Sequence, residues 1–393
     1  MGFRVVVVGA GLGGLGLAQG LRQAGIEVVV YERDSALTAR RQGYRLHIDS
    51  HGRDALVRLL PPHLLRVFQA TAGLPNPRFT ALNHRLERVF TQGVDDPAAV
   101  SLAVDRLVLR QLLLAGIEDA VEFGKELRSY EIQRDGRVVA HFADGGRADG
   151  DVLVAADGVN SAVRQQYLPH ARIADTGVRQ LYGAVPLTDR TRDLFDDNMF
   201  GVFTAITGPE RTYLGVAPVE FPVPPQQAGA AAGLTLLPVS DYMTCSFGAR
   251  REWFEDSAEV LRAMNGAQLH AIMTAATRDW HSLVREIVAH CQPDSLFALP
   301  LRTSVPIDPW PTTPVTLLGD AIHAMSPAAG SGACTALRDA ARLTIALTEA
   351  RAGGDLIVAL RAYETEMIGY GFAAVRAGAI DGQRHLGQDP LPG

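Results

Sequence analysis

Runs of apolar residues near both ends of the chain have the pattern of strands that are buried on both faces. Residues 3–8 and 26–31 are rich in valine, and residues 152–156 and 315–318 repeat the pattern much further along the chain. Because these runs show no regular alternation with polar residues, they predict a parallel sheet covered by helices. Apolar positions at helical spacing over residues 15–24 separate the first two runs. We therefore expect the start of the chain to form a βαβ unit.

The middle of the chain has a different pattern. Helical periodicity fades over residues 177–254, aromatic residues recur at intervals, and the turns carry Gly, Pro and Asp, which is typical of an antiparallel sheet. Residues 122–142 predict a hairpin with its turn at Asp135-Gly136, and residues 79–90 predict further sheet. Residues 222–233, rich in Pro, Gly and Ala, are interpreted as an exposed and flexible connection.

The C-terminal part returns to helical patterning. Two long amphipathic helices are predicted over residues 333–350 and 355–380, and the tail beyond Leu386 is expected to fray. Nearer the start of the chain, Ser50 is expected to cap a short helix over residues 53–60.

The composition is that of an ordinary globular protein, because 47% of the 393 residues are apolar and 20% are charged. A net charge of −6 gives no indication of a nucleic acid or an anionic membrane as partner. No apolar run reaches the ~18 residues that a membrane span needs. The cysteines Cys245, Cys291 and Cys334 form no CxxC pair and fit a reducing compartment. We therefore expect a cytoplasmic protein with no nucleic-acid partner and no membrane span.

The first predicted strand runs into a glycine turn with a defined chemical use. In the segment Gly9-Ala10-Gly11-Leu12-Gly13-Gly14, Gly9 permits a tight turn, Gly11 lets a pyrophosphate approach the backbone, and Gly14 lets helix and strand pack closely. Glu32 ends the second strand, where a carboxylate can accept hydrogen bonds from ribose hydroxyls. The turn is preceded by a predicted strand, followed by a predicted helix and accompanied by the acidic residue Glu32. It therefore predicts a dinucleotide site, although it does not distinguish FAD from NAD.

A second motif follows a later strand of the same predicted sheet. Asp157 and Gly158 come directly after residues 152–156, and Ser161 and Arg164 complete the pattern DGxxSxxR. For Asp157, a helix N-cap is an equally good interpretation.

A third motif, Gly319-Asp320, follows the last predicted strand, at the edge where ligands meet an open parallel sheet. A carboxylate at this position can bind a ribityl hydroxyl. The turn behind it precedes a helix and would offer backbone N–H groups to a flat polar ring. The residues of this turn and helix start are Pro327, Gly330, Gly332 and Ala333.

Taken in this order, the three motifs resemble those of the FAD-dependent aromatic hydroxylases, the single-component monooxygenases with the p-hydroxybenzoate hydroxylase fold. The pattern around Arg106, Leu109 and Leu113 is similar to the arginine-bearing helix of that family. The resemblance implies FAD as cofactor and NADH or NADPH as reductant. It also implies that O₂ adds at flavin C4a and that the hydroperoxide passes one oxygen atom to a small-molecule substrate. We expect a monomer or a homodimer.

The resemblance also implies roles for individual residues. Glu32 would bind the adenosine ribose, and Arg33 and Arg106 would lie near the adenosine or the pyrophosphate. Asp320 would bind the ribityl and pyrophosphate region. Asp157 is similar to a residue that relatives use for both FAD and NAD(P)H.

The last glycine turn carries one departure from the family pattern. The turn from Pro327 to Gly332 would approach the isoalloxazine ring. Cys334 stands where many relatives have asparagine, which removes a side-chain amide but leaves the backbone contacts. Elsewhere, Arg40 and Arg41 are candidates for the phosphates of the nicotinamide cofactor, or else form a solvated surface pair.

The predicted fold class is therefore α/β. A discontinuous Rossmann-like FAD-binding domain is interleaved with an antiparallel-sheet substrate domain, and long helices follow at the C-terminal end. The expected ranges are 1–72, 100–176 and 298–350 for the FAD-binding domain, 73–99 and 177–297 for the substrate domain, and 351–393 for the C-terminal helix and tail.

The substrate is expected to lie against the antiparallel sheet. Aromatic and sulfur-containing side chains there are suited to a flat apolar substrate, although each is also an ordinary candidate for the core. These candidates are Tyr182, Phe200, Phe203, Tyr213, Met243 and Phe247. Analogy with relatives suggests tailoring of a secondary metabolite or modification of an antibiotic.

Other functions stay open or are disfavoured on particular residues. A flavin oxidase or reductase without oxygen transfer and a non-catalytic FAD-binding sensor are the alternative hypotheses. A flavin halogenase is disfavoured because the only lysine, Lys125, lies in the predicted hairpin and no WxWxIP segment is present. His47 and His51 lack a third ligand, so no metal site is predicted.

Overall fold

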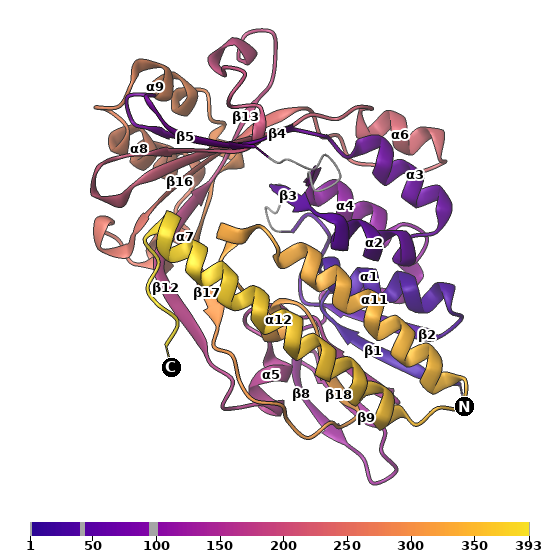
Figure 1. Cartoon of the computed structure of the whole chain (residues 1–393). Coiled ribbons are helices and arrows are strands. Elements are labelled where there is room, and N and C mark those ends of the chain that lie inside the picture. Colours follow the sequence, from indigo (N-terminus) through magenta and orange to yellow (C-terminus); the bar gives the residue numbers. More distant parts are fainter. Residues whose placement is uncertain (1, 40–43, 94–100, 393) are drawn as a thin grey trace.

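Strands from widely separated parts of the sequence assemble into one parallel sheet (Figure 1). The computed structural model describes residues 2–39, 44–93 and 101–392 of the chain. Within these ranges the sheet has the order β18-β11-β1-β2-β7. Its strands are β1 Arg4–Val8, β2 Glu27–Glu32, β7 Val121–Phe123, β11 Val152–Ala155 and β18 Val315–Leu317. The predicted parallel sheet is confirmed, and β7, which was expected in a hairpin, joins its edge.

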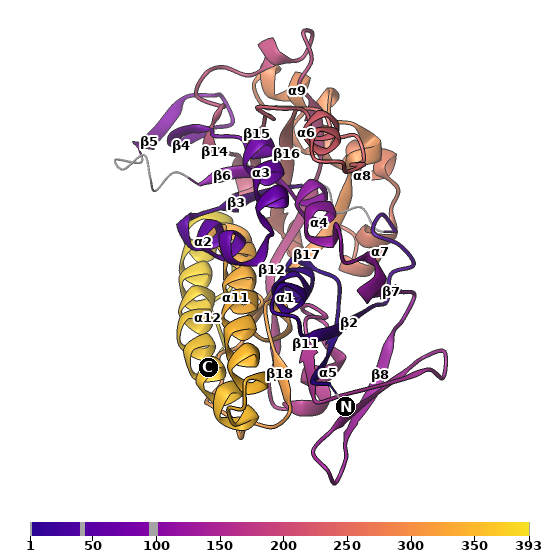
Figure 2. The same ribbon diagram turned by 90° about the vertical axis from the view of Figure 1, so that its right-hand side faces the viewer.

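The valine-rich runs are buried because the parallel sheet has helices packed against it. Val5 of the central strand β1 pairs with Val28 on one side and Val152 on the other, and all three are at most 3% exposed. Figure 2 shows the two long C-terminal helices side by side along this part of the molecule. They are α11 Gly332–Arg351, which packs on α1 Leu12–Gln23, and α12 Leu356–Leu386. Among the described helices, none has both the length and the apolar character that crossing a membrane requires.

A second, larger sheet contains most of the predicted antiparallel region. Its strands have the order β17-β12-β16-β15-β14-β4-β5, with β13 paired to β16. The pairs are antiparallel except for β14 and β4, which run parallel. The strands are β4 Asn76–Asn83, β5 Arg88–Gly93, β12 Ile173–Tyr182, β13 Ala184–Pro186, β14 Gly201–Thr207, β15 Tyr213–Val219, β16 Tyr242–Arg250 and β17 Phe297–Ser304.

The two faces of this sheet have different neighbours. Three helices cover one face, which we call the outer face, and enclose a core separate from that of the parallel sheet. They are α7 Ala258–Ala263, α8 Gly266–Ala276 and α9 Ser282–Ala289. The other face, which we call the inner face, is directed towards the small sheet of β3 Arg45–Ile48 and β6 Leu102–Asp105, as both views show (Figures 1 and 2).

A three-stranded sheet contains the predicted hairpin. Its strands are β8 Leu127–Ile132, β9 Val138–Phe142 and β10 Arg147–Gly150. The turn closes through a 2.7 Å hydrogen bond from Gln133 N to Arg137 O, and Gly136 adopts a positive φ of 87° there. The Asp135-Gly136 turn is therefore confirmed.

Two sequence predictions about the shorter helices are wrong. The helix α2 Ser50–Leu59 begins at Ser50, and its N-cap is Asp49, whose carboxylate accepts from Gly52 N at 2.8 Å. The segment 222–233 is partly exposed but is not a flexible connection, because it contains the helix α6 Pro225–Ala231, which packs on α3 Pro62–Thr71 and buries Ala228 and Gly229. The other short helices are α3 Pro62–Thr71, α4 Arg106–Leu114, α5 Ala162–Tyr167 and α10 Asp320–His323.

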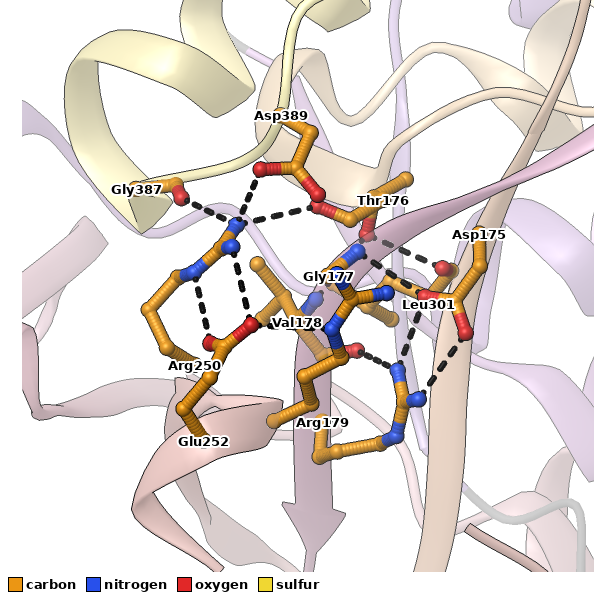
Figure 3. A network of polar contacts seen from close by, with 11 residues as sticks. Asp175, Thr176, Gly177, Val178, Arg179, Arg250, Glu252, Leu301, Gly387 and Asp389 are labelled. Atoms are coloured by element: carbon orange, nitrogen blue, oxygen red, sulfur yellow. Dashed lines mark hydrogen bonds and ion pairs between the residues drawn. The ribbon is translucent and has the colours of Figure 1, made fainter.

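The tail after α12 is anchored, contrary to the expectation that it frays. Asp389 N donates to Thr176 O at 2.8 Å, and the Asp389 carboxylate lies 2.7 Å from Arg250 Nη1. Figure 3 shows the Arg250 guanidinium between Asp389, the Gly387 carbonyl and Glu252. These contacts tie the end of the chain to β12 and β16.

Candidate functional site

The glycine turn after β1 has backbone geometry that side chains would prevent. Gly9 has a φ of +107°, and a Cβ added to it would lie 2.3 Å from Ala156 O. A Cβ on Gly14 would lie 2.0 Å from Gly9 O, so the start of α1 can approach the strand only at glycine. Gly11 is the N-cap of α1 and meets no atom within 4 Å at its Cβ position. The N-terminus of α1 thus adjoins open space, which suits a phosphate group.

Glu32 supports this turn from the end of β2. Its carboxylate accepts from Ala10 N at 2.8 Å and from Asp34 N at 2.9 Å, and the residue is 6% exposed. Arg110 of α4 holds the other side of the turn, because its Nη2 donates to Ala10 O at 2.9 Å. Arg110 is buried and was not among the residues predicted from the sequence.

One cavity of about 430 Å³ brings together residues from most of the sequence motifs. The predicted residues in its wall are Gly9, Gly11, Glu32, Arg33, Arg106, Asp157 and Asp320. Residues that the sequence analysis did not select also line it, among them Tyr44, Lys125, Asn160, Arg262, Phe297 and Arg302. The remaining predicted cofactor residues, Leu12, Gly13, Gly14, Pro327, Gly330, Gly332 and Ala333, are not in this wall.

Two polar side chains of the cavity, Arg106 and Asp157, each have a buried polar atom without a hydrogen-bond partner among the described residues. Arg106 stacks its guanidinium 5.3 Å from the centre of the Tyr44 ring, and its buried Nε has no partner among the described residues. Asp157 Oδ2 accepts from Ala162 N at 2.8 Å, while Ser161 is the N-cap of α5. Asp157 therefore supports the start of this helix without being its N-cap, and it also lines the cavity.

Asp320 enters the cavity from the end of β18. Gly319 before it has a φ of +60°, and the Asp320 carboxylate is exposed to the cavity. Burial by the surrounding protein raises the pKa of Asp320, an effect that His323 and Arg106 partly offset. The carboxylate is therefore available to hydroxyl donors of a ligand.

A buried carboxylate on α11, missed by the sequence analysis, fixes the Gly319-Asp320 turn. Asp339 Oδ2 accepts from Gly319 N at 2.7 Å and lies 2.6 Å from His323 Nε2. Its Oδ1 accepts from the Tyr370 hydroxyl at 2.6 Å. Asp339 and His323 are both fully buried. These pairs are far apart in the sequence, so no local pattern indicates them.

The turn from Pro327 to Gly332 lies close to β3. Gly330 has a φ of +64°, and a Cβ on it would lie 3.2 Å from the ring of His47. Cys334 Sγ donates to His47 O at 3.2 Å and accepts from Asp49 N at 3.4 Å. Cys334 thus joins the start of α11 to β3, in contact with the position where a Cβ on Gly52 would lie.

The substrate candidates are divided between the two faces of the large sheet. On the inner face, Phe203 stacks on Phe79 at 6.0 Å, and the Tyr213 hydroxyl donates to Gln180 Oε1 at 2.8 Å. Tyr182 stacks on Tyr44 and on Phe297 at 5.3 and 5.4 Å, and these two rings, which line the cavity, lie 6.0 Å from each other.

Met243 and Phe247 belong instead to the core on the outer face. Both are fully buried, and they pack in the cluster that contains Leu269, Met273 and other residues of the covering helices. Phe200 also packs against this cluster. We therefore exclude these three from the candidate substrate site. Arg40 and Arg41 lie outside the residues that the structure describes.

Comparisons with known proteins agree with the motifs. A family model described as FAD binding domain matches residues 103–377, and one described as NAD(P)-binding Rossmann-like domain matches residues 7–69. The chain belongs to the FAD-dependent monooxygenase family. A solved structure from Photorhabdus luminescens, assigned as an FAD-containing monooxygenase, is 31% identical, covers 98% of both chains and has a TM-score of 0.83.

More distant relatives share the fold or part of their length. The structure of 2,6-dihydroxypyridine-3-hydroxylase from Arthrobacter nicotinovorans is 20% identical with a TM-score of 0.78, covering 100% of this chain and 95% of the other. The dual O-methyltransferase/FAD-dependent monooxygenase elcB of Phaeosphaeria nodorum is 32% identical over 370 residues, which are 86% of this chain and 39% of the relative. This chain thus spans about two fifths of the length of the first such relatives, 39% and 42% for two of them.

Proposed function

We propose that this protein is a monooxygenase that uses FAD, NADH or NADPH, and O₂ to insert one oxygen atom into a small planar organic substrate. One observation carries the proposal. A single cavity gathers the glycine turn at Gly9 and Gly11, the Glu32 carboxylate and the Asp320 carboxylate, in a chain of the FAD-dependent monooxygenase family.

The polar groups of the cavity fit an extended dinucleotide. The open space at Gly11 adjoins the N-terminus of α1, where the pyrophosphate would lie. Glu32 would accept from the adenosine ribose at one end of the cavity, and Asp320 would accept from the ribityl chain nearer the other. Arg106, whose buried Nε lacks a partner among the described residues, would donate to a phosphate oxygen between them.

The isoalloxazine ring would then lie near the turn from Pro327 to Gly332, between that turn and the inner face of the large sheet. Once reduced, FAD would supply the electrons that activate O₂, so that one oxygen atom enters the substrate and the other leaves as water. Phe79, Phe203 and Tyr213 would orient an aromatic substrate and limit the access of water. We extend the proposal to an aromatic or polycyclic substrate of secondary metabolism or an antibiotic.

The test has two arms, and the first needs no substrate. Purified protein loaded with FAD is mixed with NADH or NADPH without oxygen, and loss of the oxidised flavin absorbance is followed. We expect at least one of the two nucleotides to reduce the flavin. Failure of both to do so would contradict the proposal.

The second arm measures oxygen transfer with isotopically labelled O₂ and a panel of hydroxylated aromatic compounds. A true substrate is expected to accelerate NAD(P)H oxidation and to carry one labelled oxygen atom. Arg278→Met, which changes a side chain that is 79% exposed, serves as control and should behave as the parent protein does. Accelerated NAD(P)H oxidation that yields only hydrogen peroxide would instead identify an oxidase.

A further inference from the structure

A buried arginine on β3 has no negative partner among the residues that the structure describes. Arg45 is 8% exposed, and its Nε donates to Pro218 O at 2.8 Å. Its Nη1 lies 2.7 Å from His47 Nε2, and its buried Nη2 has no partner among the described residues. No carboxylate in the described part of the chain lies within ion-pair distance of Arg45. A buried guanidinium without a counter-ion is costly, so its retention calls for an explanation.

The acidic residue opposite Arg45 in the β3–β6 pair already has other partners. Asp105 is the register partner of Arg45, but its carboxylate caps α4 by accepting from Val108 N and also accepts from the Tyr242 hydroxyl, both at 2.9 Å. Burial lowers the pKa of Arg45 to about 10, which leaves the guanidinium charged at neutral pH. Burial and the neighbouring Arg45 lower the pKa of His47 well below its usual value, so His47 is neutral and adds no negative charge.

The position of Arg45 relates it to the candidate substrate site. Pro218 belongs to β15 of the large sheet. The ring of His47, which contacts Arg45, lies 3.2 Å from the position that a Cβ on Gly330 would take, in the turn assigned to the isoalloxazine ring. Figures 1 and 2 both place β3 between the large sheet and α2. Arg45 therefore bridges the two parts of the molecule between which the substrate would lie.

We propose that Arg45 binds an anionic oxygen of the substrate, a carboxylate or a phenolate, through Nη1 and Nη2. This inference rests on the proposed function. The terminal edge of a guanidinium can donate two parallel hydrogen bonds to a carboxylate. A neutral imidazole is the weaker acceptor, so the anion replaces His47 at Nη1 and also satisfies Nη2. The shielding from water strengthens this interaction.

The inference narrows the substrate class. A neutral planar compound would leave the charge of Arg45 uncompensated, whereas an aromatic acid or an ionised phenol neutralises it. Among aromatic molecules of one size and shape, the protein should therefore prefer the anion.

Benzoate and benzamide test this preference, since they have nearly the same shape and differ in charge. Each is titrated into protein loaded with oxidised FAD, and the dissociation constant is read from the change in flavin absorbance. We expect benzoate to bind at least ~10-fold more tightly than benzamide, about the factor for one hydrogen-bonded charge pair. Arg45→Met should abolish the preference. Arg45→Lys should retain part of it, because lysine keeps the positive charge but lacks the two parallel donors of the guanidinium. Arg278→Met should leave it unchanged.

Three outcomes would overturn the inference. One is equal or undetectable binding of the two compounds to the parent protein, and another is an unchanged preference in Arg45→Met. The third is weakened FAD binding in Arg45→Met with the benzoate preference intact, which would assign Arg45 to the cofactor. If Arg45→Met does not fold, a full preference in Arg45→Lys contradicts the bidentate contact. None of these results depends on turnover, so they are distinct from failure of flavin reduction or oxygen transfer.

Discussion

The two large sheets of this protein present ligands with different kinds of surface. The parallel sheet offers strand ends, where Gly9, Glu32 and Asp320 hold bare backbone and carboxylates at fixed places around one cavity. The antiparallel sheet offers a broad face, on which Phe203 and Tyr213 belong to different strands. The position of a binding group at a strand end follows from the local backbone geometry. The side chains that form a sheet face depend instead on the strand register and on which side of the sheet each residue lies.

This difference explains why the residues at the strand ends indicate which groups they bind, whereas the residues on the face of the antiparallel sheet do not. A pyrophosphate and a ribose are recognised by groups that any member of the family must place at the strand ends. A face that binds a planar molecule through aromatic contacts can be altered at many positions without disturbing the fold. The comparison predicts that variants at strand ends change FAD affinity, and that variants on the large sheet change stability or ligand affinity according to their face.

Phe247→Ala tests the assignment of Phe247 to the outer face, and of the variants considered it should lower the free energy of unfolding the most. Phe247 is fully buried and packs 5.3 Å from Trp253, so its removal should lower the free energy of unfolding by roughly 3–5 kcal/mol. Denaturant unfolding measures this change, and benzoate titration of the folded protein should give the parent dissociation constant. Tyr213→Phe on the inner face is the matched variant and should change ligand affinity more than stability. An altered benzoate affinity in Phe247→Ala with unchanged stability would reverse the assignment of the faces.

Asp339→Asn tests how the strand end at Gly319 is fixed. The substitution leaves His323 buried without its charged partner, which should lower the free energy of unfolding by about 3 kcal/mol, the low end for a broken buried pair. FAD affinity should fall as well, because Gly319 N loses its carboxylate acceptor. Glu364→Gln is the control, since that buried carboxylate accepts from the hydroxyls of Thr312 and Thr316 and not from Gly319 N. Equal losses of FAD affinity in both variants would refute a specific role for Asp339.

The ion pair between Asp339 and His323 predicts that the free energy of unfolding depends on pH. Burial opposes the charged form of His323. The charge and the hydrogen bond of Asp339 outweigh burial, so the pKa of His323 is raised above its usual 6.5. A raised pKa in the folded state gives stability that is fully present below pH 6.5 and is lost as pH rises through the folded pKa. Unfolding measured on both sides of neutrality should show this loss in the parent protein and not in Asp339→Asn.

Glu32→Ala should have the smallest of these effects and should act on FAD affinity. The loss of a charge-assisted hydrogen bond to the ribose should cost roughly 1.5–3 kcal/mol of binding free energy. Glu32 also accepts from Ala10 N and Asp34 N, so Glu32→Gln, which keeps an acceptor oxygen, should lose less. Titration of the FAD-free protein with FAD measures both variants. An unchanged FAD dissociation constant in Glu32→Ala would exclude Glu32 from the adenosine site.

The strand ends could be predicted from sequence because their signals are local. The glycine turn needs only Gly9, Gly11 and Gly14 at fixed spacing, and its conformation follows from the positive φ and close contacts of Gly9. The same holds for Gly319-Asp320 after β18. That β18, β11 and β1 belong to one parallel sheet could also be predicted, because continuous apolar runs are typical of such strands, whereas the order of the strands could not.

The faces of the large sheet could not be predicted in this way. Along β16 the polar residues Thr244 and Ser246 alternate with Met243, Cys245 and Phe247, but the first eight residues of this strand are all buried, so the alternation separates two faces without showing which of them meets a ligand. The partners of Asp339 lie on other elements, as does Pro218, whose carbonyl accepts from Arg45, and nothing in the local sequence indicates these pairs. The segment 222–233 was misread because its small residues suit a flexible linker as well as the short helix that packs on α3.

The placement of FAD across the strand ends is the central claim, and a crystal structure of the protein with bound FAD tests it most directly. We expect electron density for the adenosine beside Glu32, for the pyrophosphate at the N-terminus of α1 and for the ribityl chain at Asp320. The isoalloxazine ring should lie between the turn at Gly330 and the inner face of the large sheet. Density that runs in the opposite direction, or lies outside the cavity that joins Gly9, Glu32 and Asp320, would contradict this account.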